Sequence, residues 1–344
     1  MSDQENLEVG SGPEPQGRGR QANSPTEVPP SGWLDVLRRT VSEAKQDRVT
    51  LLAAGVAFFF FLALVPLLVV VVSMYGLLAS PAEIRQFASD WLAAAPREVR
   101  RLVTSQLETI ARTSNGRAVF GVIAGVLVAL WSASTGVSHL VAAVNAAFDE
   151  VDQRKAWRRR GLSLGLTLGS LAFGVLAIVL IAVLPSALAD SDFATGTRWV
   201  IDVLRWPLLA GGMLVGLGVL YRWAPDRSDA RWVWVTPGTL LGLGIWLGGS
   251  GLFSLYAANF GRFQATYGSL ASIVVMLLWL FVSAYAVIMG AEFNAESERQ
   301  TFRDTTTGPA RPLGDRGAYA ADTVGRSRRS PRRWLRRPGA RRGK

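Results

Sequence analysis

The sequence of 344 residues contains no cysteine and a single histidine, His139. Without cysteine, the chain can form neither a disulfide nor a thiolate metal site. One imidazole cannot supply a zinc site built on several histidines, and no HExxH motif or paired-carboxylate spacing occurs within an apolar segment. A GxxxxGK[ST] motif is also missing, so direct use of ATP is not expected. These absences predict a protein that is not an enzyme and holds no metal or cofactor.

Charged residues are scarce too, at 18% of the chain, whereas 49% of the residues are hydrophobic. Five charge-free stretches exceed the roughly 20 residues that cross a bilayer core. They are residues 49–82, 118–148, 161–189, 232–261 and 263–291. A sixth apolar stretch, 199–223, is interrupted in its first half by Asp202 and Arg205, which stand close enough to pair. The sequence therefore predicts an all-α polytopic membrane protein with about six transmembrane helices.

We expect spans near residues 49–78, 117–148, 161–185, 199–223, 233–258 and 267–293, within a membrane domain of residues 33–298. Residues 1–32 are rich in Pro, Gly and Ser and contain no signal-peptide h-region, which predicts a disordered N-terminal tail. An amphipathic interfacial helix is predicted over 33–48. Two further amphipathic patterns lie within 79–117. Residues 299–344 are predicted to be a disordered, Arg-rich cytoplasmic tail.

The positive charge is concentrated, which bears on topology and on partners. Of the formal net charge of +11, most comes from residues 326–344, which contain nine Arg and Lys344. The short loops 149–160 and 224–231 are also basic, so the positive-inside rule places both termini in the cytosol. A flexible tail of this kind favours anionic lipid headgroups as partners, and no nucleic-acid partner is expected.

Small residues recur four apart in several predicted spans. The second span has Gly121 and Gly125, the third has Gly161, Gly165 and Gly169, and the fifth has Gly238 and Gly242. In membrane helices such spacing allows two backbones to approach closely. We therefore expect these glycines to serve helix packing.

Three strings resemble a known family: SLYAANF from Ser254, ATYGSLAS from Ala265 and GAEFNAE from Gly290. With AAGVAFFFFLALVPLL from Ala53 and LWSASTGVSHLVAAVNAAFDE from Leu130, they resemble the YihY/BrkB family of bacterial inner-membrane proteins. The resemblance covers roughly residues 33–300. It implies a six-helix protein of the bacterial cytoplasmic membrane. Members carry virulence, serum-resistance or older ribonuclease labels, and lipid export has been proposed for the family.

The polar residues of the predicted spans suggest a pathway. At about 100° per residue, Ser134, Ser138 and Asn145 share one face of the second span, and His139 lies on the opposite face. Pro66 should kink the first span. The alternative for the Ser and Asn residues is hydrogen bonding between helices. The candidate pathway and headgroup contacts are Pro66, Ser134, Ser138, His139, Asn145, Arg154, Arg158, Asn259, Tyr267, Glu292 and Asn294.

Two hydrolytic functions compete with this hypothesis. The string Gly248–Gly251 is similar to the GxSG of rhomboid-type proteases, but Ser250 and His139 should differ in depth by about 12 Å. A ribonuclease would need metal-bound carboxylates or a base in an accessible groove. We therefore expect transport of a lipid or another anionic amphiphile. The alternative is a non-transporting membrane scaffold or accessory factor in envelope maintenance.

Overall fold

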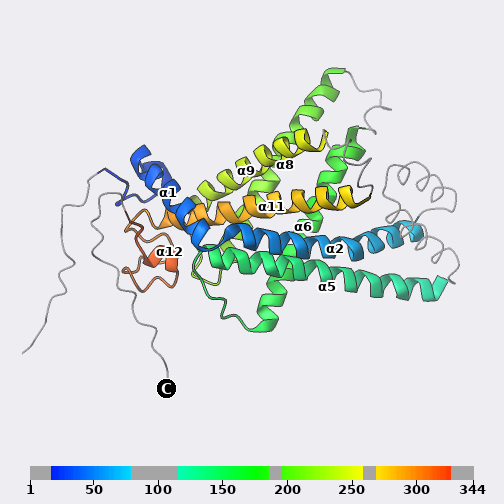
Figure 1. The fold of residues 1–344 in the computed structure, drawn as a ribbon, viewed down its shortest axis with the longest axis horizontal. Helices are drawn as coiled ribbons and strands as arrows, with labels where there is room; N and C mark the ends of the chain where they lie inside the picture. The colour runs from blue at the N-terminus through cyan, green and yellow to red at the C-terminus, as the bar shows by residue number, and fades with distance from the viewer. Residues whose placement is uncertain (1–16, 79–114, 186–194, 259–268, 327–344) are drawn as a thin grey trace, which may run out of the picture.

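The structure of the protein is a computed structural model, which describes residues 17–78, 115–185, 195–258 and 269–326 (Figure 1). No β-strand occurs in these ranges, where an isolated bridge pairs Ala230 with Thr306. The helices are α1 (Pro30–Gln46), α2 (Val49–Leu78), α5 (Asn115–Ala147), α6 (Ala156–Ile178), α8 (Thr195–Trp223), α9 (Trp232–Ala258), α11 (Ser269–Glu298) and α12 (Tyr319–Asp322). A 3-10 turn, η1 (Pro25–Glu27), precedes α1, and a π-helical segment, η2 (Val179–Val183), extends α6.

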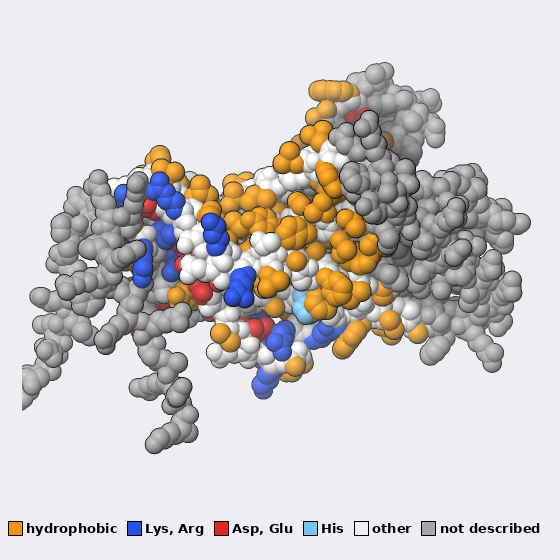
Figure 2. Space-filling view, in the orientation of Figure 1, with side chains coloured by type: hydrophobic (Ala, Val, Ile, Leu, Met, Phe, Trp, Pro, Cys, Tyr) orange, Lys and Arg blue, Asp and Glu red, His pale blue; other side chains and the backbone are white. Residues whose placement is uncertain are grey.

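Five of these helices, α5, α6, α8, α9 and α11, are long and apolar enough to cross a membrane. Helices α1 and α2 meet at a bend of 64°, and together they provide a sixth candidate span. The predicted fold class, an all-α membrane protein with about six spans, is confirmed. Space-filling Figure 2 agrees with this class, since hydrophobic side chains cover the middle of the visible face and charged side chains gather towards the end with α1 and α12.

Helix α11 organises the bundle, because it packs against α9, α2, α5 and α1. The buried core draws on the halves of these helices that lie near α1 and α12 in Figure 1. Representative core side chains are Val49 and Val56 of α2, Val141 and Phe148 at the end of α5, Tyr221 of α8 and Ile288 of α11. The tightest packing therefore lies next to the charged end of the bundle.

The close approach of α9 to α11 depends on glycine. A Cβ atom added to Gly238 would collide with the carbonyl oxygen of Gly290, and one added to Gly290 would collide with the Tyr221 hydroxyl. That hydroxyl donates a hydrogen bond of 2.7 Å to the carbonyl of Val287. Here the expected role of small residues in helix packing is observed.

The glycine stripe of α6 departs from that expectation. Cβ atoms built on Gly161, Gly165 and Gly169 would meet nothing within 4 Å, and Gly125 of α5 is equally open. Only 6% of the α6 span is buried within the described chain. The spacing of these glycines is compatible with helix packing, but within the described residues no neighbouring helix occupies the stripe.

Parts of the two predicted disordered tails are folded against each other. The amide of Phe302 donates a 2.8 Å hydrogen bond to the carbonyl of Arg20, and the Thr301 hydroxyl donates a 2.7 Å bond to the carbonyl of Ala22. Residues 17–32 and 299–326 thus differ from the expected disorder, because long-range polar contacts replace the apolar periodicity that they lack. The remaining tail residues, 1–16 and 327–344, lie outside the described residues.

Candidate functional site

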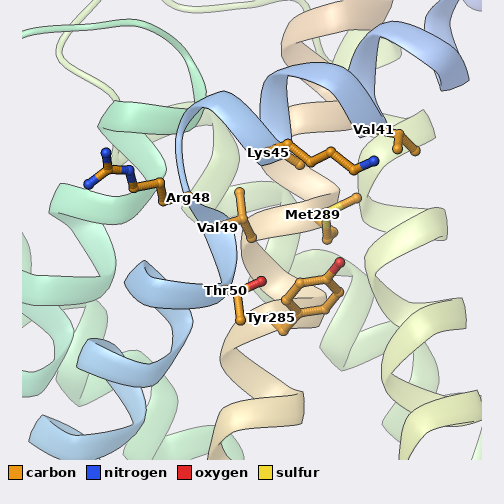
Figure 3. A pocket seen from close by; sticks show the side chains of 8 residues that line it. Val41, Lys45, Arg48, Val49, Thr50, Tyr285 and Met289 are labelled. Atoms are coloured by element: carbon orange, nitrogen blue, oxygen red, sulfur yellow. The ribbon is translucent and has the colours of Figure 1, made fainter.

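A pocket of about 330 Å³, here called the joint pocket, lies where α1, the start of α2 and α11 meet. Figure 3 shows the side chains of Lys45, Thr50 and Tyr285 around it, whereas the Arg48 side chain points away. The full lining is Val41, Ala44, Lys45, Arg48, Val49, Thr50, Tyr285 and Met289. The pocket therefore combines apolar walls with a cation and hydroxyl groups.

The bend between α1 and α2 creates this pocket. Helix α1 ends at Gln46 and α2 begins at Val49, so the joint between them consists of Asp47 and Arg48. Arg48 has φ of 54°, in the left-handed region that residues with a Cβ atom rarely adopt. Sparsely populated backbone conformations of this kind tend to occur at ligand sites and switch regions.

Next to the joint pocket lies a pair of carboxyl groups. Tyr285, Met289 and Glu292 share one face of α11, at separations of four and three residues. The Glu292 residue is 1% exposed, and no donor among the described residues bonds to its buried Oε1 atom. The Glu292 carboxyl faces the Asp47 carboxyl of the joint, where the two side chains can share a hydrogen bond. Since an ionised carboxylate is only an acceptor, this bond requires a proton on one of the two groups.

Two nearby arginines pair with other carboxylates. The Arg39 guanidinium of α1 pairs with Glu296, and the Arg299 guanidinium pairs with Glu296 and, at 3.5 Å, with Glu43. Among the described residues, neither Asp47 nor Glu292 forms an ion pair. Burial raises the pKa of the Asp47 carboxyl above its ordinary value; the hydrogen bond with Glu292 opposes this rise, and the Glu43 carboxylate adds to it.

The predicted polar residues of α5 connect helices. Ser138 donates a hydrogen bond of 2.8 Å to the Ser134 carbonyl and contacts the Ser163 hydroxyl of α6 at 2.9 Å. The Ser134 side chain is buried and donates to the Trp131 carbonyl at 2.9 Å. Ser138 therefore contributes to the α5–α6 contact, the bond of Ser134 stays within α5, and neither serine lines the joint pocket.

Asn145 and Arg154 meet at the turn between α8 and α9. Both donate to the carbonyl of Ala224, Asn145 Nδ2 at 3.2 Å and Arg154 Nη1 at 2.9 Å. The amide of Asp226 donates back to Asn145 Oδ1 at 2.8 Å, and Arg154 Nε pairs with the Asp226 carboxylate at 3.1 Å. The structure thus brings these two predicted residues together as an anchor for a turn.

The other predicted residues are dispersed. His139 stacks on Phe59 of α2 with ring centroids 3.6 Å apart, and Asn294 Oδ1 accepts a 2.6 Å hydrogen bond from the Gly238 amide. Arg158 is exposed beside Trp157, at 5.1 Å from its ring centroid. Pro66 lies within α2, and the kink expected there stays a prediction. Asn259 and Tyr267 lie outside the described residues.

Of the predicted residues that the structure describes, only Glu292 lies next to the joint pocket. Lys45, Asp47 and Tyr285 were missed, although one signal was available: the polar string Lys45–Thr50 between an amphipathic helix and an apolar run. For the protease alternative, Ser250 Oγ is buried without a described partner, while the described ring contact of His139 is Phe59. Among the described residues, no group of three or more His, Cys, Asp or Glu could hold a metal ion.

The helices and their apolar surfaces define a multi-pass α-helical membrane protein. The chain belongs to the BrkB family, since residues 40–313 match the family described as "Virulence factor BrkB". It is 30% identical to the "Putative ribonuclease-like protein YfkH" of Bacillus subtilis (strain 168), over 71% of this chain and 88% of that protein. A "UPF0761 membrane protein" of Tolumonas auensis is 27% identical, over 72% and 80% of the two chains. No solved structure is significantly similar to the chain.

Proposed function

We propose that this BrkB-family protein binds and translocates an anionic amphiphile, such as an anionic phospholipid, in the cytoplasmic membrane. The observation that carries the proposal is the joint pocket, which places the Lys45 ammonium above apolar walls that include Val49 and Met289. A cation over an apolar pocket matches a ligand with an anionic head and a hydrocarbon tail.

The size of the joint pocket limits what it holds. At about 330 Å³ it is at the lower end of ligand pockets, which accommodates a headgroup but not two acyl chains. The chains would lie on the exposed apolar side chains of α2, which begin at Leu51, next to Thr50, and continue with Phe58 and Leu62. With its headgroup in the pocket and its acyl chains along α2, the ligand would stay partly in the bilayer.

The orientation of the bundle supports a site at the cytoplasmic interface. Helix α1 buries Val36 and Thr40, whereas Leu34, Leu37 and Val41 are exposed, as expected of a helix that lies on a membrane surface. By the positive-inside rule, the basic loop 149–160 favours a cytosolic location for this end of the bundle and for both termini.

A membrane scaffold is the second candidate function. The specific observation in its favour is that Ser138, Asn145 and Asn294 hydrogen-bond between structural elements rather than lining a route. In that case the joint pocket would hold a structural lipid that does not move between leaflets.

A lipid-scrambling assay separates these functions. The protein is reconstituted into liposomes with a headgroup-labelled fluorescent phosphatidylglycerol, and a membrane-impermeant quencher reports which leaflet the label occupies. We expect faster exchange than in empty liposomes, a clear loss in Lys45→Gln and Val41→Trp, and wild-type exchange in Lys155→Gln. Lys155 is the matched control, because it is an exposed lysine on a loop that contributes nothing to the joint pocket. Exchange equal to that of empty liposomes would contradict translocation and favour the scaffold.

A further inference from the structure

The Asp47–Glu292 pair connects the two walls of the joint pocket. Asp47 lies in the joint between α1 and α2, two residues after the pocket-lining Lys45. Glu292 lies on α11, one turn beyond the pocket-lining Met289. The two facing carboxyl groups therefore connect the α1–α2 wall with the α11 wall.

We propose that Asp47 and Glu292 hold one proton between them and exchange it when the joint pocket binds or releases its anionic ligand. The coupling between proton exchange and ligand binding rests on the proposed function. The proton site itself rests on the contact between the two carboxyl groups. The protein would then move an anion and a proton together.

A proton suits this pair better than a metal ion. Two carboxyl groups that face each other at hydrogen-bond range share a single proton, and the buried Oε1 atom of Glu292 has no described donor. A metal ion would need more ligands, and no described cluster provides them. Burial also disfavours a second negative charge at this position.

Charged groups around the Asp47–Glu292 pair affect how readily it holds a proton. Glu43 faces it from α1, Glu296 from the next turn of α11, and Asp149 from the residues after α5. Arg299 is the cation that acts on Asp47, while Arg39 pairs with Glu296. The three carboxylates favour retention of the proton, and Arg299 opposes it.

Loss of the proton would change the pocket. Two carboxylates at hydrogen-bond distance repel each other in a buried site, so the α1–α2 joint would move away from α11. Ligand binding should favour protonation: an anionic headgroup beside Lys45 adds negative charge near the pair and increases the affinity of the pair for the proton. Because linkage is reciprocal, the proton increases the affinity for the anion to the same extent.

Infrared spectroscopy tests whether the pair is protonated. At neutral pH the reconstituted wild-type protein should show a protonated carboxyl C=O band that Glu292→Gln loses and that Glu27→Gln, which changes an exposed carboxylate, retains. The amide introduced by Glu292→Gln mimics the protonated side chain, so we expect the variant to fold. If it does not, titration of the wild-type band remains decisive. A wild-type protein without the band at neutral pH would overturn the proton site.

Proton uptake tests the coupling separately. Detergent-solubilised protein in weakly buffered solution with a pH indicator receives short-chain phosphatidylglycerol, or zwitterionic phosphatidylcholine as a control. We expect proton uptake that saturates together with phosphatidylglycerol binding, and loss of uptake but not of binding in Glu292→Gln. Binding without uptake would overturn the coupling. Absence of binding would overturn both the proposed function and the coupling, whereas the infrared band would still decide whether the pair holds a proton.

Discussion

Arg227 and Glu298 form an ion pair in which both side chains are fully buried. Arg227 Nη2 lies 2.6 Å from Glu298 Oε1, and Arg227 Nη1 donates to Oε2 at 3.1 Å. The guanidinium also lies 4.4 Å from the Phe148 ring centroid, and Glu298 Oε2 accepts a 2.8 Å hydrogen bond from Thr305. This pair joins the α8–α9 turn, the end of α5, the end of α11 and the folded C-terminal segment.

Removal of one partner of this pair should be costly. Glu298→Gln leaves the guanidinium of Arg227 buried without a counter-charge, and the loss in the free energy of unfolding should be about 3–5 kcal/mol. The double variant Arg227→Met/Glu298→Leu should recover most of that loss, because neither charge is then buried. Thermal unfolding in detergent measures both. Equal destabilisation by the single and double variants would show that the charge itself does not matter.

Glycines at a close helix contact and glycines in open space should respond differently to substitution by alanine. Gly290→Ala should lower the free energy of unfolding by about 1–3 kcal/mol, because the added methyl group would collide with the Tyr221 hydroxyl of α8 and the Gly238 carbonyl of α9. Gly165→Ala, in open space on α6, should be neutral or stabilise by up to about 1 kcal/mol through helix propensity. Melting temperatures of the purified variants test this order. A strongly destabilising Gly165→Ala would indicate that a partner covers the α6 stripe.

The sequence was sufficient to predict the helical spans, because long charge-free runs are a local property. It was insufficient for residues 299–326, where order depends on contacts between distant segments. Arg316 shows why: its guanidinium donates to the carbonyls of Phe302 at 2.7 Å, Ala321 at 2.7 Å and Arg303 at 3.1 Å. Nothing in the local pattern distinguishes this arginine from the arginines of a solvated tail.

The candidate site was predicted only in part for a similar reason. Helical periodicity correctly grouped Ser134 and Ser138 on one face of α5, but periodicity does not reveal whether a polar face meets a pathway or another helix. The joint pocket depends on the left-handed conformation of Arg48 and on the resulting 64° bend. A backbone conformation at a single arginine leaves no signature in composition or spacing, so Lys45 and Asp47 were not singled out.

The shared contact of Asn145 and Arg154 predicts coupled effects. Both side chains donate to the Ala224 carbonyl, so Asn145→Ala and Arg154→Ala should each destabilise the protein by about 1–3 kcal/mol. The double variant should show an interaction energy of about 0.5–3 kcal/mol. Arg158→Ala is the control, because this exposed arginine makes no such contact with the turn. Strict additivity in unfolding measurements would contradict a common anchor.

The stability of the protein should depend on pH through Asp149. Burial of the Asp149 carboxyl raises its pKa even though the residue reaches the surface, and the negative charge of Asp47 adds to the rise. A folded-state pKa above the unfolded one means that the folded protein binds more protons between the two values. The free energy of unfolding should therefore fall as the pH rises through that window, and this loss should persist at neutral pH.

Asp149→Asn should remove this contribution. The variant should melt at a higher temperature than the wild type at pH 7, and the difference should shrink as the pH falls below the ordinary aspartate range. Asn is suited to the position, because the backbone of Asp149 is left-handed, with φ of 56°. Asp202→Asn, which removes a half-exposed carboxylate paired with Arg205, serves as the control. A stability difference for Asp149→Asn that does not change with pH would assign the effect to the backbone rather than to the charge.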